Sequence, residues 1–326
     1  MRRILRIARG ARSIRGARLA TGYLVLAASA SVLFALGMAA QTQAQKTFAT
    51  PEDAVRALAK ANKTGNTNSL LAVFGPDAAK VVSSGDPVAD KRGREVFTVA
   101  YEEGSRLEAE SPDKEILYIG NEDWPFPIPL VKTAGQWRFD TAAGANEILY
   151  RRIGRNELST IHVCLAVVEA QKEYASVGHD GKPAGLFAAR FHSEPGKHNG
   201  LYWKVNEGEP LSPLGDLTAE ASTEGYIHTK GSHAPFHGYH FHLLKAQGKD
   251  APGGAKSYIV NSEMSEGFAL VAYPAEYGNS GVMTFIVNQQ GTVFEKDLGE
   301  ETSKLASEMA EYNPDNTWRQ AVGPEE

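Results

Sequence analysis

The segment that most constrains the fold is the longest helical pattern outside the N-terminal region, residues 145–175. Two sets of residues in it recur at steps of three and four, the spacing of side chains that share one helix face. They are Leu158, Ile161, Leu165, Val168 and Lys172, and Val163, Val167, Ala170 and Tyr174. At about 100° per residue, the two sets fall on roughly opposite faces. A surface helix needs only one apolar stripe. The pattern therefore predicts a helix buried between two layers, a sheet made by the chain after it and the segment before it.

The chain contains a single cysteine, Cys164, which lies in this helical segment. No intramolecular disulfide can form, so stability must come from packing. We interpret Cys164 as a small core residue rather than a nucleophile, because buried thiols are usually inert.

Charge is distributed unevenly along the chain. Residues 1–44 contain seven arginines and no acidic residue, which leaves 27 Lys and Arg against 39 Asp and Glu in the remainder, a formal charge of −12. Phosphate contacts need clusters of Lys and Arg, so this acidic remainder is not expected to bind nucleic acid. Binding of this part to anionic lipid is disfavoured for the same reason.

Residues 1–44 have the three parts of a secretory signal peptide. Seven arginines form the basic part, residues 23–40 are apolar, and residues 42–44 (T-Q-A) offer a cleavage site. An uncleaved anchor is the alternative, because the apolar run is about long enough to span a bilayer. By the positive-inside rule, both interpretations place the rest of the chain outside the cytoplasm. We expect a periplasmic or secreted protein or, if the segment is uncleaved, one anchored in the inner membrane by that segment alone.

Residues 46–142 have the pattern of a small α+β domain. Thr50 is a suitable N-cap before a proline, and the first helix should end near Gly65. The other expected elements are helices at residues 69–74 and 92–106 and strands at residues 115–119, 128–133 and 136–140. Ala134 and Gly135 between the last two strands are a hairpin signal. The order of elements, with P-E-D-A at the start and G-Q-W-R-F-D at the end, resembles cone-shaped domains of the nuclear-transport-factor-2-like type, a class that often has a cavity.

Residues 143–321 combine the long helix with a series of strand patterns. Strands are expected at residues 239–245, 258–261, 268–274, 282–287 and 293–296, and a last helix at residues 300–312. In the first of these strands, large apolar side chains alternate with histidines, as in a half-buried strand. The sequence as a whole predicts an α+β fold, in which a small α+β domain precedes a long helix packed on an antiparallel sheet.

Four motifs stand out in the chain after residue 44. They are W-R-F-D-T-A-A-G at residues 137–144, R-R-I-G-R-N-E-L at 151–158, P-G-K-H-N-G-L-Y-W at 195–203, and G-F-A-L-V-A-Y-P-A-E-Y-G-N-S-G-V-M-T-F-I-V-N at 267–288. These motifs resemble a bacterial family of exported proteins known as domain of unknown function 2950. The resemblance extends from Phe48 to Ala321. It implies no established activity.

A second resemblance concerns the C-terminal part. A helix with A-N-E and A-Q-K-E-Y-A, followed by a Gly-rich loop and G-V-x-T-F-x-V, is similar to the soluble part of type IV pilins and pseudopilins. The resemblance implies a long helix packed on an antiparallel sheet. The chain departs from the pilin pattern at Arg151, Arg152 and Arg155, which stand where a pilin stalk has apolar residues.

The densest group of polar side chains is a histidine cluster. It consists of His228, His233, His237, His240 and His242. His240 and His242 are two residues apart on an expected strand, so both imidazoles face one side, as a pair of metal ligands must. His237 or His233 is close enough in sequence to supply a third ligand. Neutral imidazoles suit zinc or another divalent transition metal. The alternative is the solvent face of a strand beside a loop.

Several aromatic residues lie in or beside loops rich in Gly and Pro. They are Trp124, Phe126, Tyr202, Trp203, Tyr273 and Tyr277. Such residues either fill the core beneath long connections or line a groove for a glycan, a peptide or an apolar ligand.

The sequence contains no nucleophile elbow, phosphate loop or dinucleotide fingerprint. We therefore favour a non-enzymatic binding or scaffold module of the cell envelope without a cofactor, and leave enzymatic activity open. Its expected partner is an envelope protein, a glycan or a small apolar ligand. The alternative is a metal-binding protein or a metal-dependent hydrolase that uses the histidines between His228 and His242.

Overall fold

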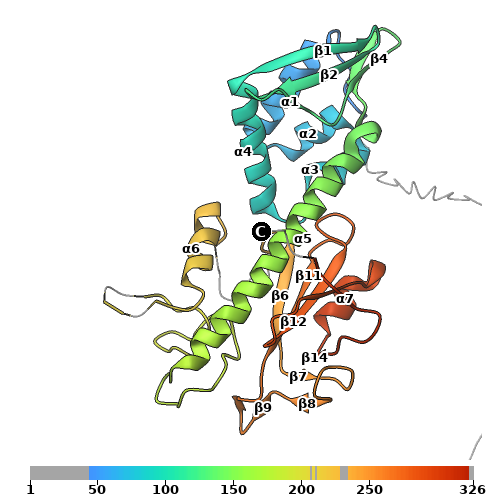
Figure 1. Cartoon of the computed structure of the whole chain (residues 1–326). Coiled ribbons are helices and arrows are strands. Elements are labelled where there is room, and N and C mark those ends of the chain that lie inside the picture. The colour runs from blue at the N-terminus through green and yellow to red at the C-terminus, as the bar shows by residue number, and fades with distance from the viewer. Residues whose placement is uncertain (1–43, 206–207, 210, 228–233, 323–326) are drawn as a thin grey trace, which may run out of the picture. The chain divides into compact units, whose positions relative to one another are not determined.

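The structure is a computed structural model that describes residues 44–205, 208–209, 211–227 and 234–322 (Figure 1). All of them belong to one compact unit, residues 42–326. Residues 1–43 of the predicted signal peptide, and His228 and His233 of the histidine cluster, lie outside the described residues. The helices and antiparallel sheets of the described part confirm the predicted α+β class.

The N-terminal part is an antiparallel sheet covered by helices. The helices are α1 (Pro51–Thr64), α2 (Thr67–Phe74), α3 (Ala79–Val82) and α4 (Pro87–Glu103), with a 3-10 turn, η1, at Pro76–Ala78. The strands are β1 (Ser105–Ser111), β2 (Lys114–Ile119), β3 (Trp124–Pro125), β4 (Leu130–Thr133) and β5 (Gln136–Phe139). They pair in the order β1-β2-β4-β5, and β3 pairs with β2. Helices α1 and α2 contact β5, and α4 contacts β2, so the helices and the sheet enclose a common core.

Local sequence signals account for several boundaries in this part. The side chain of Thr50 accepts a hydrogen bond from the backbone N–H of Asp53 at 3.2 Å, as an N-cap does. Gly65 ends α1 with a φ of 63° in the left-handed region that favours glycine. Ala134 and Gly135 both have positive φ, 50° and 80°, as the tight turn of a β-hairpin requires. The predicted cap, helix end and hairpin are confirmed.

Helix α4 begins earlier than the predicted start at residue 92. Asp86 caps it, because its Oδ1 accepts hydrogen bonds from the N–H groups of Val88 and Ala89 at 3.0 and 3.1 Å. Pro87 occupies the first helical position, where its missing N–H costs nothing. Strand β1, which the sequence analysis missed, is almost entirely exposed and therefore lacks an alternating apolar pattern.

Helix α5 (Thr141–Ser176) confirms the long helix and extends it by a few residues at its start. It contacts α3 and η1 of the N-terminal part, and β11 and β12 of the C-terminal sheet defined below. Gly144 permits a close approach of α5 to the backbone between β3 and β4, because a Cβ there would lie 2.3 Å from the carbonyl oxygen of Pro127. Figure 1 shows α5 running from the N-terminal helices to the C-terminal sheet.

The predicted burial of α5 on two opposite faces is wrong. Leu158 and Leu165, from one predicted stripe, are 43% and 41% exposed. Between Asn156 and Tyr174, the buried residues all fall within about 180° of the helix circumference at about 100° per residue. Two layers do cover this half, the sheet and the loop after the helix. The side chain of Gln171 in α5 forms two hydrogen bonds with the backbone of Ala188 in that loop. Both layers lie on the same side, and the other side faces solvent.

The C-terminal part is built on a five-stranded antiparallel sheet. Its strands are β6 (Tyr239–Leu244), β11 (Ala269–Pro274), β12 (Met283–Asn288), β13 (Phe294–Asp297) and β15 (Arg319–Gln320), in the order β15-β13-β12-β11-β6. The central strands β11 and β12 are almost completely buried, because α5 packs on the sheet and α7 also contacts β11. The remaining elements are α6 (Gly215–Glu224), α7 (Thr302–Ser307), the 3-10 turn η2 (Gly299–Glu301), β7 (Ala246–Gln247), β8 (Lys256–Ser257), β9 (Ile259–Val260), β10 (Glu263–Met264) and β14 (Glu311–Tyr312).

Two expected elements differ in this part. The last helix, predicted for residues 300–312, ends at Ser307, and residues 311–312 instead form β14, which pairs with β7 in parallel. The strand predicted at residues 258–261 is reduced to β9 in a two-residue hairpin with β10. In both places, tertiary pairing overrides a local pattern.

The buried apolar side chains form two separate groups. One lies within residues 54–139 and the other within residues 161–312. The boundary between residues 142 and 143 stays a prediction, since α5 joins the two groups without a break. Among the helices of the described residues, none combines the length and apolar character that a membrane span requires.

Candidate ligand-binding pocket

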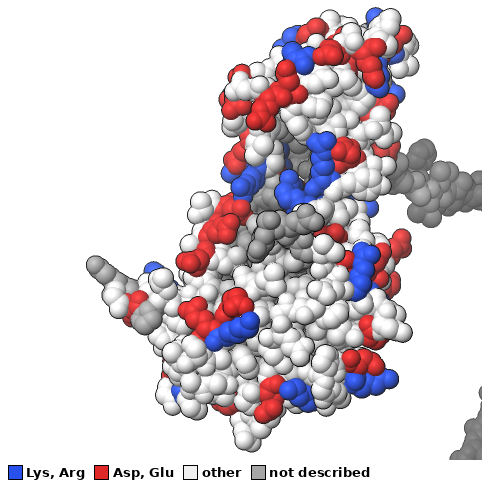
Figure 2. All heavy atoms as spheres, viewed as in Figure 1, with Lys and Arg blue, Asp and Glu red and all other residues white. Residues whose placement is uncertain are grey.

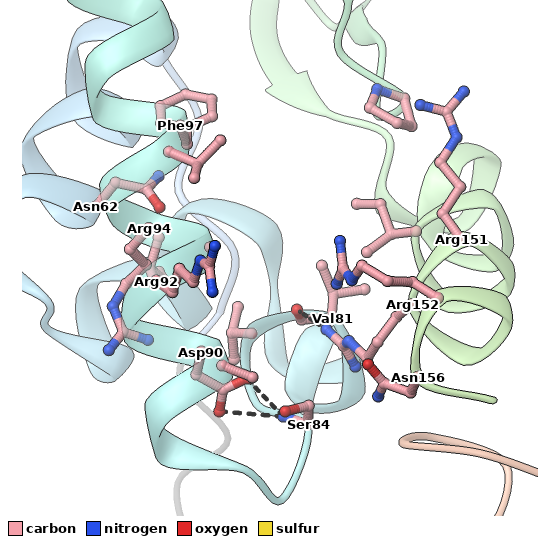
Figure 3. Close-up of a pocket in the computed structure, with 18 of the residues that line it drawn as sticks. Asn62, Val81, Ser84, Asp90, Arg92, Arg94, Phe97, Arg151, Arg152 and Asn156 are labelled. Atoms are coloured by element: carbon pink, nitrogen blue, oxygen red, sulfur yellow. Dashed lines mark hydrogen bonds between the residues drawn. The ribbon is translucent and has the colours of Figure 1, made fainter. Parts of the chain in front are cut away.

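A cavity of about 800 Å³ opens between α4 and α5. Figure 2 shows it as a hollow with Lys and Arg side chains on both of its sides, and Figure 3 shows the residues that line it. Its size is that of pockets for small organic ligands. The walls come from α4 and α5, the floor from the N-terminal core, and part of the rim from Glu224, Tyr226 and His237.

The floor of the pocket is apolar and aromatic. Phe74 and Phe126 are stacked with ring centroids 6.2 Å apart, and Phe97 meets Phe126 edge-to-face at 5.6 Å. Leu70, Ile119 and Ile148 complete this surface. Trp124 stands at the rim, 41% exposed. The apolar or aromatic part of a ligand would pack against these side chains and be removed from water.

Arginines dominate the walls. Arg92 and Arg94 project from α4, and Arg151 and Arg152 from α5 (Figure 3). Arg155 of α5 also lines the pocket. Among the described residues, only two carboxylates, those of Asp90 and Glu224, line the same space. An excess of positive charge in a pocket of such an acidic chain favours an anion over a cation there.

The five arginines differ in how they are held. Arg151 donates to Glu147 at 2.6 Å and lies 5.4 Å from the ring centroid of Trp124. The guanidinium groups of Arg94 and Arg155 make no hydrogen bond or ion pair with any residue that the structure describes. Guanidinium groups with unused donors are those that an anionic ligand can engage.

Arg152 is a fixed part of the wall. Its Nη1 donates to the carbonyl oxygen of Lys80 and to Oδ1 of Asn279, both at 2.6 Å, and its Nη2 to the carbonyl oxygen of Val81 at 2.8 Å. Burial lowers the pKa of Arg152 from its usual value, against the opposing effect of Asp90. Three of the roughly five guanidinium N–H donors are used, which leaves two.

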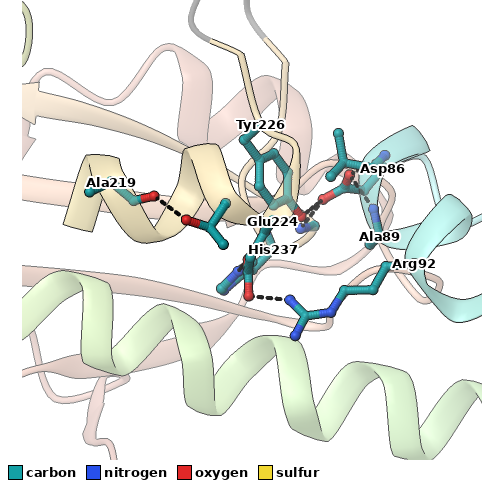
Figure 4. Close-up of polar contacts among 10 residues, drawn as sticks. Asp86, Ala89, Arg92, Ala219, Glu224, Tyr226 and His237 are labelled. Carbon is teal, nitrogen blue, oxygen red and sulfur yellow. Dashed lines mark hydrogen bonds and ion pairs between the residues drawn. The ribbon is translucent and has the colours of Figure 1, made fainter. Parts of the chain in front are cut away.

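An ion-pair chain closes one side of the pocket (Figure 4). Glu224, the last residue of α6, pairs with Arg92 of α4 and with Nε2 of His237. Burial raises the pKa of Glu224, but the hydrogen bonds from His237 and Arg92 outweigh it and hold the pKa below its usual value. His237 also stacks on Phe236 with centroids 4.1 Å apart. These contacts hold His237 in place despite its φ of 49°, a region that costs a non-glycine residue energy.

A second set of polar contacts, the hydrogen bonds of Asp86, connects the start of α4 to the C-terminal part. Asp86 is 1% exposed, and its Oδ2 accepts hydrogen bonds from Oη of Tyr226 at 2.8 Å and from the N–H of Gly238 at 2.9 Å. Burial, with Asp86 alongside, raises the pKa of Tyr226 above its usual value, so its hydroxyl stays a donor. The pocket walls are therefore held by buried hydrogen bonds rather than by apolar contact alone.

The structure brings only two of the six predicted ligand-binding aromatics together. Trp124 and Phe126 line the pocket, with ring centroids 6.3 Å apart. Tyr202 and Trp203, in the segment between α5 and α6, pack against the C-terminal core. Tyr273 lies on β11 beside His240, and Tyr277 donates to Asp297 at 3.2 Å. These four residues lie away from the pocket.

The predicted metal ligands are divided between two places. His240 and His242 share a face of β6 beside Tyr273, and Nε2 of His242 lies 3.0 Å from the carbonyl oxygen of Met309. His237 instead pairs with Glu224 at the pocket. The described residues contain no group of three or more His, Cys, Asp or Glu arranged to hold a metal ion. The metal site stays a prediction.

Cys164 is completely buried in α5, as predicted. Burial raises the pKa of its thiol from 9.0 to about 12. At neutral pH the group is a thiol, and it takes no part in the pocket.

The arginines of the wall were not predicted as site residues. A signal was present, because R-R-x-x-R at residues 151–155 places three arginines on neighbouring positions of one helix. A second basic stretch, K-R-G-R at residues 91–94, stands in α4. Both interrupt an otherwise acidic chain, but no sequence pattern shows that they face each other.

The chain was compared with known proteins. A family model described as protein of unknown function (DUF2950) matches residues 45–321. The chain belongs to the DUF2950 family. No curated protein and no solved structure gives a match. Membership of DUF2950 confirms the family resemblance and assigns no activity, so the function must be argued from the pocket.

Proposed function

We propose that this DUF2950 protein is a non-enzymatic binding module of the cell envelope whose ligand is a small anion with an apolar body. One observation carries the proposal, the cavity of about 800 Å³ with an aromatic floor and five arginines in its walls. Ligand pockets combine an apolar lining with a few convergent polar groups, as this cavity does. The formal charge of −12 on residues 45–326 repels anions elsewhere, so the arginines mark the place where an anion is favoured.

A scaffold role has less support than ligand binding. The exposed large apolar residues of α5 are Tyr150, Leu158 and Leu165, which are 68%, 43% and 41% exposed. Single exposed apolar residues are normal on soluble proteins, and a stable protein contact buries on the order of 800 Å² per partner. The pocket is the larger and more specific feature.

Export is part of the proposal. Its support is the basic and apolar pattern of residues 1–44, and the chain is hydrogen bonded into the fold from the next residue on. The side-chain nitrogen of Gln45 donates to the carbonyl oxygens of Val73 and Phe139 at 3.0 and 2.8 Å. Mass spectrometry of the protein from an envelope fraction should give Gln45 as the first residue. A chain that keeps residues 1–44 in the cytoplasmic fraction would contradict export.

Ligand binding is tested with two fluorescent probes of the same ring system. 8-Anilino-1-naphthalenesulfonate carries a sulfonate, and N-phenyl-1-naphthylamine lacks it. The purified protein should bind the sulfonate saturably, and about tenfold more tightly than the neutral probe, since one charge-assisted contact is worth about 1.4 kcal/mol or more.

A pair of double variants locates the binding. Arg94→Gln with Arg155→Gln should weaken the sulfonate about tenfold and leave the neutral probe unchanged. Arg56→Gln with Arg319→Gln removes the same charge from two exposed arginines outside the pocket, and should change neither probe. Equal loss in both double variants would show that net charge alone attracts the sulfonate, and the proposal would fail.

A further inference from the structure

The charge balance of the pocket narrows the chemistry of its ligand. Arg92 is neutralised by Glu224 and Arg151 by Glu147. The other three arginines, Arg94, Arg152 and Arg155, have no carboxylate within ion-pair distance among the described residues. Asp90 also lines the pocket and offsets one of these three charges, so a monoanion would match only half of the remaining charge and a dianion all of it.

The positions of these arginines add a geometric constraint. Arg94 lines the pocket from α4, whereas Arg152 and Arg155 line it from α5. A carboxylate is planar and offers its two oxygens along one edge, which suits a single guanidinium fork. A phosphate offers three strong acceptor oxygens in different directions, so one group can bond guanidiniums from both walls.

We infer that the ligand is a phosphate monoester, with its dianionic head held between Arg94 and Arg155 and its apolar body on the aromatic floor. This rests on the proposed function and names the ligand class for the same pocket. The two free N–H donors of Arg152 supply a third contact from a fixed side chain. Phe97 and Phe126 lie at the floor, where a ring or short alkyl body would pack.

A series of naphthalene probes separates charge, shape and body. Calorimetry on the purified protein compares 1-naphthyl phosphate, 1-naphthalenesulfonate, 1-naphthoate, 1-naphthol and inorganic phosphate. The naphthyl phosphate should bind at least about tenfold more tightly than each of the others, because a second charge adds a further charge-assisted contact. The sulfonate shares the tetrahedral shape without the second charge, and inorganic phosphate shares the charge without the apolar body.

The pH dependence gives an independent readout. The second pKa of a phosphate monoester is about 6, so the ratio of phosphate to sulfonate affinity should rise as pH increases from about 5 to about 7.5. The sulfonate keeps one charge throughout and therefore reports any ionisation of the protein itself, including that of His237, Glu224 or Asp90 around the pocket. If the ratio of phosphate to sulfonate affinity does not change with pH, the inference that the head is bound as a dianion is wrong.

The variants connect the preference to the two walls. In Arg94→Gln with Arg155→Gln, the preference for naphthyl phosphate over the sulfonate should disappear, while the Arg56→Gln, Arg319→Gln control keeps it. If the sulfonate or naphthoate binds to the wild type as tightly as naphthyl phosphate does, the inference of a phosphate monoester is wrong, and the pocket remains a site for anions in general. If inorganic phosphate binds as tightly as naphthyl phosphate, the inference that the ligand has an apolar body is wrong. If no probe binds saturably, the proposed function itself fails.

Discussion

Removal of the Asp86 carboxylate tests whether buried hydrogen bonds hold the pocket walls. In Asp86→Ala, α4 loses the cap that Val88 and Ala89 use, and the donors of Tyr226 and Gly238 lose their acceptor. A cap is worth about 1 kcal/mol, and an orphaned buried donor costs about 1–3 kcal/mol. Because Tyr226 is only half-buried and can turn to water, we expect a total loss of about 3 kcal/mol in the free energy of unfolding.

The assay is urea unfolding followed by far-UV circular dichroism. Asn66→Ala is the matched control, because Asn66 caps α2 through the N–H of Ser69 at 2.9 Å and its side chain bonds nothing else in the described structure. It should cost about 1 kcal/mol. Asp86→Asn should fall between the two, since an amide offers one acceptor oxygen where the carboxylate offers two. If Asp86→Ala costs no more than Asn66→Ala, the bonds to Tyr226 and Gly238 do not stabilise the fold and the reasoning is refuted.

Three further predictions concern α5, each measured by chemical unfolding. Gly144→Ala should lower the free energy of unfolding by about 1–3 kcal/mol, because its Cβ would meet backbone at 2.3 Å. Gly154→Ala has open space around the new Cβ and should raise the free energy of unfolding by about 0.5–1 kcal/mol. Equal effects of the two substitutions would contradict the close approach at Gly144. Ile161→Ala should cost about 2–4 kcal/mol and Leu158→Ala less than about 1 kcal/mol, and a large loss at Leu158 would contradict its place on the solvent side. The thiol of Cys164 should resist Ellman's reagent in the folded protein and react on unfolding. Because burial raises the pKa of this thiol, its contribution to stability is complete below pH 9.0 and declines as pH rises toward about 12. Reaction with the reagent in native buffer would contradict the burial of Cys164.

Much of the fold was predictable where local chemistry decides it. The cap at Thr50, the left-handed Gly65, the turn at Ala134 and Gly135, and the long helix all follow from residue type and spacing. The main strands of the C-terminal sheet were also found, because their apolar runs are continuous.

The errors occurred where packing decides. Leu158 and Leu165 fit an apolar stripe, but helical spacing does not show which faces have a partner. Residues 311–312 fit the end of a helix and instead pair with β7. The start of α4 is the exception, because Asp86 and Pro87 carry a local start signal that was overlooked.

The pocket could be predicted only in part. Trp124 and Phe126 were selected by their surroundings of Pro and Gly, and both line it. The arginines of α4 and α5 come together through tertiary structure, which no spacing rule gives. The placement of His237 at the pocket, away from His240 and His242, has the same cause, because its partner Glu224 lies on another element.

The central claim is that the pocket between α4 and α5 binds an anion with an apolar body. The most direct test is a crystal structure of the protein with 8-anilino-1-naphthalenesulfonate. We expect the sulfonate within hydrogen-bond distance of Arg94 or Arg155 and the rings on Phe97 and Phe126. The probe bound elsewhere, with the pocket holding only water, would contradict it.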